Sequence, residues 1–414
     1  MNNQIKICGG KKLTGEVTVS SCKNSAVAIL PSVVLASEVV KLFDVPNIED
    51  IKILIKLLKL LNIDVHQNGD ALTIDTTDIK SVDLLDDDVR KLRASYYFMG
   101  ALLGRFKHVR MLSPGGCNLG PRPIDLHLKG FEALGAKITR EDDIIQIDAD
   151  ELIGDEIYLD IASVGATINI MLAACFAKGK TTIENAAEEP EIIDLSSMLN
   201  KMGAKIRGAG TSEITIQGVS RLKGCIHDII PDRIEAGTYI IAAAAVGENI
   251  TVNNVIPQHI EALTSKLEEM GVNLQIGSDF VKVIGRNNLK AVDIITQPFP
   301  GFATDLQQPL TTLMTQAEGN SHIEETLYLE RFRHCDELNK LGANIEHRTG
   351  HSIIHGKTPL HGGQIRATDL RCGAALVIAG LIADGETIID DAYHIYRGYE
   401  SIVEKLRNLG AEIE

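Results

Sequence analysis

The sequence predicts an α/β fold of two domains, each built from three copies of one structural unit. Three observations lead to this prediction. One phrase recurs six times along the chain, each copy carries a second and almost wholly apolar helix, and the N-terminal residues match the ends of other copies. A chain of 414 residues is also long enough to bury two full cores.

The recurring phrase is typical of a helix end followed by a strand. It reads "EALGAKI", "NKMGAKI", "EEMGVNL", "NKLGANI" and "RNLGAEI", and "KLLNIDV" is an altered first copy. The copies follow one another at intervals of about 70 residues, so that six account for the whole chain. We expect one residue of each copy to take the left-handed conformation that ends a helix. These residues are Asn62, Gly135, Gly203, Gly271, Gly342 and Gly410.

A second helix in each copy has a small-residue, apolar body. "SSCKNSAVAILPSVVLA" and "ASVGATINIMLAACFAKG" are two of the six examples. Helices that are apolar nearly all round lie inside a domain. Most of them begin at Ser, Asp or Thr, the residue types that cap helix N-termini.

The N-terminal segment "IKICGGKKLTGEVTVS" matches "ITIQGVSRLKGCIHDI", which ends the third copy. We therefore expect residues 1–20 to complete the sixth copy, which is otherwise short. The chain then starts in its last domain, crosses to the first and returns near Pro231. This predicts one domain of residues 21–230 and another of residues 1–20 plus 231–414, with an active site in the cleft between them.

Composition narrows the class of protein. The net charge of −15 argues against nucleic acid as a partner, and no apolar run reaches the 18 residues of a membrane span. Seven cysteines without a C-x-x-C pair indicate reduced thiols, with neither a disulfide frame nor a zinc site. The start "MNNQIKICGG" lacks a signal-peptide pattern, so we expect a cytoplasmic protein. Because the sequence has no zinc pattern and its histidines are scattered, we also expect no metal.

Polar residues gather at the starts of the six apolar helices. They are Lys23 and Asn24, Arg93, Ser163 and Gly165, Asp232 and Arg233, Asp305, and Asp369 and Arg371. A cation at a helix N-terminus is unfavourable by itself, so Lys23, Arg93 and Arg371 indicate a bound phosphate or carboxylate. The acidic residues allow two interpretations, because Asp232 and Asp369 are equally well caps and Asp305 is either a cap or a general base.

Two further candidates lie outside these helix starts. Cys117, in "SPGGCNLGPRPIDLH", has glycines before it and Arg122 close enough to lower the pKa of its thiol, which indicates a reactive group on a moving loop. The other cysteines fit a core, although Cys22 beside Lys23 is ambiguous. Arg397, in "YHIYRGYES", is either a surface salt-bridge partner or an anion ligand.

These motifs together resemble the MurA family of enolpyruvyl transferases, the UDP-N-acetylglucosamine 1-carboxyvinyltransferases. The phrases "PGGCNLGPRPIDLH", "CKN", "LRAS", "SVGAT", "EPEI", "PDRIEAGT", "TDLQ", "ATDLRC" and "RGYE" occur in the family's order over the whole chain. The resemblance implies two inside-out α/β barrel domains, each of three βαβαββ units. It implies transfer of the enolpyruvyl group of phosphoenolpyruvate to the 3′-hydroxyl of UDP-N-acetylglucosamine, with release of phosphate.

By this resemblance the reaction is an addition followed by an elimination, which starts peptidoglycan precursor synthesis and needs no cofactor or metal. It implies that Cys117 donates a proton and can carry a covalent adduct, and that Asp305 is the base. Lys23, Arg122 and Arg397 are expected to hold phosphoenolpyruvate, with Asn24 and Arg371 nearby. The expected nucleotide-sugar residues are Arg93, Arg122, Pro123, Ile124, Asp125, Leu126, Ser163, Val164, Gly165, Asp305 and Leu327.

Some positions depart from the family pattern. "SSCKN" stands for S-G-A-K-N, "FATD" for F-P-T-D, and Ile161 where some members carry a lysine. None removes an expected catalytic group. The alternatives are 5-enolpyruvylshikimate-3-phosphate synthase, which lacks the "PGGC" loop, and a paralogue that binds nucleotide sugars without turnover. Cys117 argues against the first, and the joint presence of Cys117, Asp305, Lys23 and Arg397 argues against the second.

Overall fold

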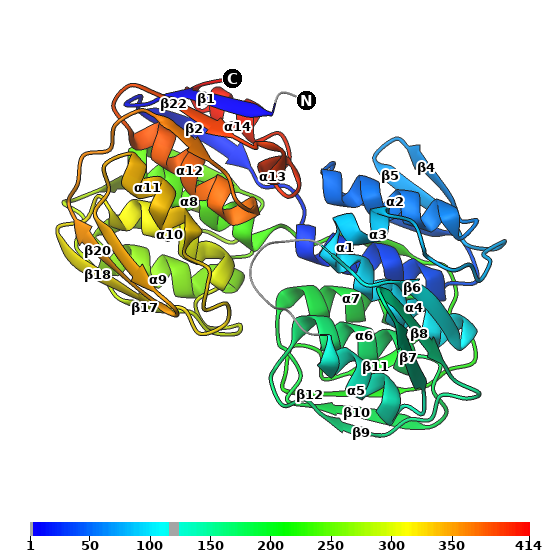
Figure 1. Ribbon diagram of the computed structural model, residues 1–414. Coiled ribbons are helices and arrows are strands. Elements are labelled where there is room, and N and C mark those ends of the chain that lie inside the picture. The colour runs from blue at the N-terminus through cyan, green and yellow to red at the C-terminus, as the bar shows by residue number, and fades with distance from the viewer. Residues whose placement is uncertain (1–2, 116–123) are drawn as a thin grey trace. The chain divides into compact units, whose positions relative to one another are not determined.

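The strands form six separate sheets, three in each of two units. Figure 1 shows the computed structural model, which describes residues 3–115 and 124–414. We call residues 21–230 the middle unit, and residues 3–20 with 231–414 the terminal unit, because the latter contains both chain ends. The chain passes between the units at Ser20–Ser21 and at Ile230–Pro231.

The middle unit contains two four-stranded sheets and one three-stranded sheet. Their strand orders are β13-β3-β5-β4, β6-β8-β7 and β11-β12-β10-β9. The strands are β3 (Val40–Phe43), β4 (Asp64–Asn68), β5 (Ala71–Asp75), β6 (His108–Leu112), β7 (Lys137–Glu141), β8 (Ile144–Asp148), β9 (Glu156–Tyr158), β10 (Lys180–Glu184), β11 (Lys205–Arg207), β12 (Glu213–Gln217) and β13 (Ile226–Asp228).

The terminal unit contains three four-stranded sheets. Their orders are β15-β16-β14-β2, β17-β18-β20-β19 and β21-β22-β1-β23. The strands are β1 (Gln4–Cys8), β2 (Leu13–Thr18), β14 (Gly247–Asn253), β15 (Val272–Ile276), β16 (Phe280–Arg286), β17 (Ile294–Ile295), β18 (Gly319–Glu324), β19 (Ile345–Arg348), β20 (His351–Gly356), β21 (Gln364–Arg366), β22 (Glu386–Asp390) and β23 (Glu412–Ile413).

Each sheet takes one parallel partner from an earlier or a distant part of the chain. The parallel pairs are β13 with β3, β9 with β10, β2 with β14, β17 with β18, and β21 with β22. In the three-stranded sheet a parallel bridge from Leu84 to Met111 takes this place. The other ladders are antiparallel hairpins. The three sheets of a unit are thereby linked in a ring by the backbone itself.

The N-terminal strands separate after Cys8. β1 pairs with β22 and β23, so it completes the sixth copy as expected, whereas β2 joins the sheet of the fourth copy beside β14. β2 thereby corresponds to β13, which ends the third copy and pairs with β3 of the first. What the sequence did not indicate is that the last strand of a copy joins the sheet of another copy.

Three helices in each unit are buried along nearly their whole surface. They are α1 (Lys23–Ser32), α4 (Tyr97–Phe106) and α6 (Val164–Ala174) in the middle unit, and α8 (Arg233–Val246), α10 (Thr304–Met314) and α12 (Leu370–Ile382) in the terminal unit. Amphipathic helices accompany them: α2 (Glu49–Leu60), α5 (Asp125–Ala133), α7 (Pro190–Lys201), α9 (Glu261–Glu269), α11 (Arg333–Lys340) and α14 (Ile402–Asn408). Short elements are α3 (Asp88–Lys91), α13 (Tyr393–Tyr396), and the 3₁₀ turns η1 (Val33–Leu35), η2 (Arg93–Tyr96) and η3 (Pro257–Ile260).

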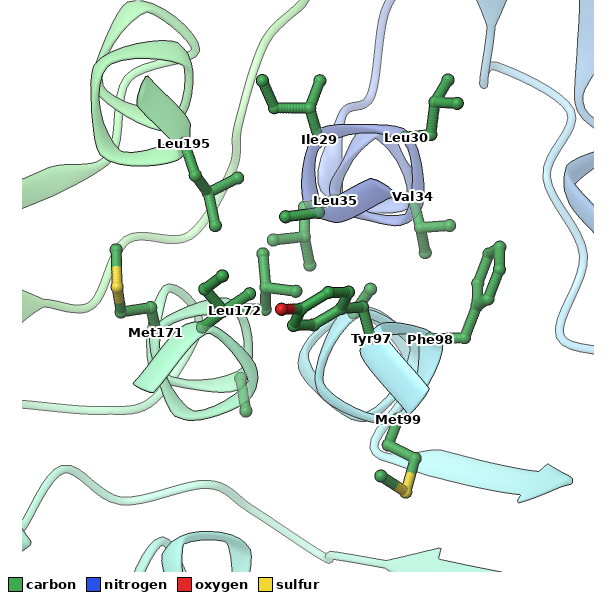
Figure 2. Packing of buried hydrophobic residues seen from close by; sticks show 14 of the residues in the cluster. Ile29, Leu30, Val34, Leu35, Tyr97, Phe98, Met99, Met171, Leu172 and Leu195 are labelled. Atoms are coloured by element: carbon green, nitrogen blue, oxygen red, sulfur yellow. The ribbon is translucent and has the colours of Figure 1, made fainter. Parts of the chain in front are cut away.

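The buried helices form the centre of each core. Figure 2 shows Leu35 after α1, Tyr97 on α4 and Leu172 on α6 meeting in the middle unit, and the terminal unit has a second core of its own. Close helix contact depends on small residues, since a Cβ at Gly100 would lie 2.3 Å from the carbonyl oxygen of Asn169. The helices lie inside and the sheets pack over them. Within the described residues each sheet stays open with three or four strands, so no single sheet closes into a β-barrel.

The predicted helix ends are confirmed. Asn62 has φ of 60°, and the five glycines of the repeated phrase have φ between 94° and 106°. Three of the expected caps are confirmed as well, because Ser163, Asp232 and Asp369 accept backbone N–H bonds at the starts of α6, α8 and α12. In the described part of the chain, no helix combines the length and apolar character that a bilayer crossing requires.

Candidate active site

The start of α1 places Lys23 and Asn24 against two buried carboxylates. The Lys23 Nζ lies 3.2 Å from Oδ2 of Asp50, on α2. The Asn24 Nδ2 donates to Oε1 of Glu191, on α7, at 3.5 Å. Asp50 and Glu191 are 0% and 3% exposed. Helices on either side of α1 therefore fix the direction of a cation and an amide at its N-terminus.

Arg93 begins η2, which leads into α4. Its guanidinium carbon lies 5.7 Å from the ring centre of Tyr96, a distance typical of a cation–π contact. The Tyr96 ring in turn meets the imidazole of His127 edge-on, with ring centres 4.8 Å apart. Arg93 is half-buried, so the aromatic pair supports a positive charge that still reaches the surface of the unit.

His127 is a neutral residue of known tautomer in this arrangement. Asn169 Oδ1 accepts the N–H of Gly100, so the other amide atom, Nδ2, must donate to His127 Nδ1 at 2.8 Å. The imidazole proton is therefore on Nε2. Burial, and to a smaller extent the positive charge of Arg93, lower the pKa of His127 to about 3. Apart from its place near the Cys117 loop, nothing in the sequence indicated that His127 is a buried, neutral partner of Asn169 and Tyr96.

The start of α6 brings backbone N–H groups beside the same aromatic pair. Ser163 caps the helix, accepting the N–H of Ala166 at 3.3 Å. A Cβ at Gly165 would lie 2.8 Å from His127 Cε1 and 2.9 Å from the Tyr96 hydroxyl, so only glycine fits without displacing them. Ser163 and Val164 are half-buried. A helix N-terminus of this kind attracts anions through its unpaired N–H groups.

The remaining predicted residues of the middle unit lie at the start of α5. Ile124 precedes the helix and Leu126 lies in its first turn, both half-buried against the core. Asp125 is exposed and accepts a bond from Arg140 at 3.3 Å. The predictions that concern Cys117, Arg122 and Pro123 fall outside the described residues.

In the terminal unit, two arginines hold Asp305. Arg331 Nη1 donates to Asp305 Oδ1 at 2.8 Å. Arg371 donates to the other oxygen, Oδ2, through Nε at 3.1 Å and Nη2 at 2.9 Å. Both arginine side chains are 3% exposed, whereas the Asp305 side chain is 26% exposed. The carboxylate is thus the accessible member of a buried cluster.

The charge state of Asp305 follows from these neighbours. Burial by itself would raise the pKa of the carboxyl group, but Arg371 and Arg331 lower that pKa well below its ordinary value. Of the two interpretations from sequence, the cap is wrong. Ala303 occupies the cap position of α10, and the described bonds to the Asp305 side chain come from the two arginines. Asp305 is therefore an anion that binds two arginines from other elements and remains partly exposed, instead of capping its own helix.

Arg371 is fixed from several sides in the first turn of α12. Asp369 caps this helix, accepting the N–H groups of Arg371 at 3.0 Å and of Cys372 at 3.1 Å. The guanidinium carbon of Arg371 lies 5.4 Å from the ring centre of Tyr399, whose hydroxyl bonds to Thr238 Oγ1 at 2.9 Å. Asp369 is therefore the cap that the sequence allowed, and it also orients the arginine.

The other predicted residues of the terminal unit lie on its loops. Leu327 is half-buried, and its N–H donates to Oε1 of Glu325 at 2.9 Å. Arg397 follows α13 and is half-buried; burial lowers the pKa of nearby His394, and the Arg397 charge lowers it too. Asp232 caps α8 through bonds from Ile234 and Glu235 at 2.8 and 3.0 Å.

The structure thus brings some predicted residues together and adds others. Asp305 and Arg371 are in direct contact, whereas Arg331, Glu325, Asp50 and the partner role of Glu191 were not predicted. The Glu191 segment was noticed only because its phrase "EPEI" resembles a family motif, and no contact was predicted for Glu191. Arg331 lies in an ordinary polar phrase, "ERFRH", where nothing marks its burial. Among residues 3–115 and 124–414, no group of histidine, cysteine and acidic side chains is arranged to hold a metal ion.

The comparisons define a class and then a family. The sequence pattern of EPSP synthase (3-phosphoshikimate 1-carboxyvinyltransferase) matches residues 7–406. The enolpyruvyl transferase NikO from Streptomyces tendae superimposes with a TM-score of 0.91 at 27% identity, over 99% of this chain and 98% of that one. EPSP synthase from Acinetobacter baumannii shares the fold, with a TM-score of 0.75 at 20% identity over 99% of both chains. Fold and pattern together define an enolpyruvyl (carboxyvinyl) transferase.

Curated relatives narrow this class. UDP-N-acetylglucosamine 1-carboxyvinyltransferase 2 of Geobacillus kaustophilus is 54% identical over 411 residues, 99% of this chain and 96% of its own. UDP-N-acetylglucosamine 1-carboxyvinyltransferase 1 of Staphylococcus haemolyticus is 55% identical over 414 residues, with 99% and 98% covered. The chain belongs to the UDP-N-acetylglucosamine 1-carboxyvinyltransferase family.

Proposed function

We propose that this protein transfers the enolpyruvyl group of phosphoenolpyruvate to the 3′-hydroxyl of UDP-N-acetylglucosamine, the first committed step of peptidoglycan precursor synthesis. The observation that carries this proposal is the identity of 54–55% to transferases of that name over nearly the whole chain. The match to the pattern of EPSP synthase, which is also a carboxyvinyltransferase, supports the same type of group transfer.

The reaction needs acid–base groups and cations. In the addition, the 3′-oxygen bonds to C2 of phosphoenolpyruvate, a proton goes to C3, and the hydroxyl proton goes to a base. In the elimination, C3 loses a proton, the bond from C2 to the phosphate oxygen breaks, and phosphate leaves. The charges that must be held are a carboxylate and a phosphate. The cationic helix starts of both units supply groups of the required sign.

For phosphoenolpyruvate we propose Lys23, Arg122, Arg371 and Arg397 as the cations. Lys23 is supported by its position at the N-terminus of α1, where the helix dipole already favours an anion. Its contact with Asp50 directs the ammonium group, and Asn24 beside it adds an amide donor. Arg371 sits at the corresponding place on α12.

Asp305 is proposed as the base near the sugar hydroxyl. A carboxylate held by two guanidinium groups is a weak base, because its pKa is low. When Arg371 turns toward the anionic substrate, Asp305 loses part of this stabilisation and its pKa rises. Binding of phosphoenolpyruvate thereby prepares the base, which links the first substrate to activation of the second.

Cys117 is proposed as the proton donor to C3 and as the residue that can carry a covalent adduct. The support is the sequence around it: the preceding glycines permit loop movement, and the charge of Arg122 nearby in sequence is expected to lower the pKa of the thiol and so make it a stronger acid. Closing such a loop would exclude water, which strengthens the electrostatic interactions with the substrates. Neither a metal nor an organic cofactor is required by these steps.

For the nucleotide sugar we propose Arg93, residues 122–126, Ser163 to Gly165, Asp305 and Leu327. The N-terminus of α6 is suited to the diphosphate, because its first turn packs against the Tyr96–His127 pair, and Tyr96 also supports the positive charge of Arg93. UDP-N-acetylglucosamine, which the names of the relatives give as their substrate, carries a diphosphate that such a helix N-terminus can bind. We further propose that the chain contains six copies of one βαβαββ unit, three in the middle unit and three in the terminal unit, and that the protein acts in the cytoplasm.

Phosphate release tests the proposed reaction. Wild-type protein with phosphoenolpyruvate and UDP-N-acetylglucosamine is compared with the same protein given phosphoenolpyruvate and shikimate 3-phosphate. We expect release only with the nucleotide sugar. Release only with shikimate 3-phosphate would assign the chain to the sister activity. Release with neither acceptor, together with binding of the nucleotide sugar, would identify a binding paralogue.

A further inference from the structure

Glu325 is a buried carboxylate that the proposed mechanism does not use. It follows β18 directly and is 1% exposed. Within the described residues no lysine, arginine or histidine forms an ion pair with it; hydroxyl and backbone N–H groups bond to both of its oxygens. A buried carboxylate held only by neutral donors is costly, so its position requires an explanation.

One oxygen of Glu325 shapes the loop that carries Leu327. Oε1 accepts the N–H groups of Leu327 at 2.9 Å and of Tyr328 at 3.0 Å, and the hydroxyl of Thr296 at 2.8 Å. These bonds turn the chain immediately after β18. The backbone and side chain of Leu327, a proposed nucleotide-sugar contact, therefore depend on this oxygen for their position.

The other oxygen of Glu325 is connected to Asp305. Oε2 accepts the hydroxyl proton of Thr304 at 2.8 Å. Because that single proton points to Glu325, the Thr304 oxygen is left to accept a bond from Arg331 Nη1 at 3.0 Å. The same Nη1 donates to Asp305 Oδ1 at 2.8 Å. A carboxylate only accepts bonds, so Glu325 fixes the direction of the Thr304 hydroxyl and turns its oxygen toward the arginine that holds the proposed base.

We propose that Glu325 is a positioning residue that orients both the Leu327 loop and the Arg331–Asp305 pair. This inference rests on the proposed function of Asp305 and Leu327. Glu325 acts through Leu327 on nucleotide-sugar binding, and through Thr304 and Arg331 on the base. One buried residue thereby couples correct placement of the acceptor sugar to correct placement of the group that deprotonates it.

Three substitutions separate the arms. Glu325→Gln keeps an oxygen for the Leu327 and Tyr328 N–H groups, but its amide donates toward Thr304 and reverses that hydroxyl, which then points its proton at Arg331. Thr304→Val removes the second arm alone. We expect Glu325→Gln and Thr304→Val each to lower kcat about 10-fold or more with little change in the KM of UDP-N-acetylglucosamine. Glu325→Ala loses both arms, so we expect it also to raise that KM about 10-fold.

Matched variants separate positioning from loss of stability. Thr304→Ser retains the hydroxyl and should recover most of the kcat lost in Thr304→Val. Asn339→Ala removes two bonds to Ile345 at the far end of α11 and should lower the thermal midpoint without changing either kinetic constant. All assays are made at a temperature at which every variant is folded. Normal kcat in both Glu325→Gln and Thr304→Val would overturn the inference.

A measurement that does not depend on catalysis tests the positioning role of Glu325 separately from the proposed reaction. Hydrogen exchange is measured at the Leu327 and Tyr328 amides of wild type and Glu325→Ala, and we expect faster exchange in the variant. If wild type releases no phosphate with either acceptor, the proposed function fails whatever the exchange shows. If wild type is active but these amides exchange equally fast in both proteins, the positioning role of Glu325 is wrong.

Discussion

Arg371 binds one oxygen of Asp305 through two of its nitrogens, Nε at 3.1 Å and Nη2 at 2.9 Å, while Arg331 takes the other oxygen. The two buried arginine side chains share this one directly bonded carboxylate. Asp369 near Arg331 and Asp232 near Arg371 add further negative charge. An anionic substrate at Arg371 must therefore compete with Asp305 for the same guanidinium group.

Asp305→Asn should destabilise the terminal unit strongly. The variant removes the charge of the carboxylate that bonds directly to both buried guanidinium groups, and removing one partner of a buried pair typically costs about 3–5 kcal/mol. Glu269→Gln, which breaks an exposed pair with Lys266 in the same unit, should change the free energy of unfolding by less than about 1 kcal/mol. Denaturant unfolding followed in the terminal unit measures both.

The Asp305 effect has a defined pH dependence. The pKa of the folded carboxyl group is lowered from the ordinary value of about 3.9 in an unfolded chain. Its stabilising contribution is therefore fully present above about pH 4 and declines as the pH falls further. The difference between wild type and Asp305→Asn should narrow in acid. A difference that stays constant from pH 7 to pH 3 would contradict the low pKa.

Lys23→Ala should weaken phosphoenolpyruvate binding. Loss of one charge-assisted hydrogen bond costs about 1.5–3 kcal/mol, which corresponds to an increase of roughly 10-fold to 100-fold in the KM of phosphoenolpyruvate. Lys129→Ala removes an exposed lysine that pairs with Asp160 in the same unit and serves as the control. Steady-state phosphate release over a range of phosphoenolpyruvate concentrations measures the effect. Equal KM values for Lys23→Ala and Lys129→Ala would reject this placement of Lys23.

Local rules predicted more of this fold than of its site. The left-handed helix ends at Asn62 and the repeated glycines follow from one residue and its neighbours, and they are confirmed. The exchange of β2 into another sheet was missed, because it depends on which of two similar edges is open after packing. Arg331 was missed for a related reason. Its pairing with Asp305 joins residues on separate elements, and a single sequence carries no signal for that contact.

Cys117→Ser should abolish most turnover while leaving binding of UDP-N-acetylglucosamine intact, because a hydroxyl is a much weaker acid than a thiol. An epoxide such as fosfomycin should inactivate wild type through this thiol. Burial raises the pKa of Cys175 and of Cys372 to about 12, so these thiols stay protonated and unreactive. Mass spectrometry should find one adduct, at Cys117, and phosphoenolpyruvate should slow its formation. Full activity after prolonged exposure would refute this role.

Two buried histidines should make the protein sensitive to mild acid. Burial lowers the pKa of His127 in the middle unit and of His334 in the terminal unit to about 3, whereas an unfolded histidine titrates near pH 6.5. A group with a lowered folded pKa stabilises the protein above its unfolded pKa, so stability should fall below about pH 6.5, by about 1.4 kcal/mol per pH unit for each proton bound on unfolding.

His127→Asn tests this dependence in the middle unit. The Asn side chain retains an oxygen that can accept the bond from Asn169, but it cannot titrate, so the acid slope of that unit should decrease by one proton. His66→Asn, which changes an exposed histidine paired with Asp64, is the control and should leave the slope nearly unchanged. Nitrogen NMR of wild type should show the Nε2–H tautomer of His127 persisting to pH 5. An imidazole that protonates near pH 6.5 in the folded protein would contradict the buried neutral state and the bond direction assigned to Asn169.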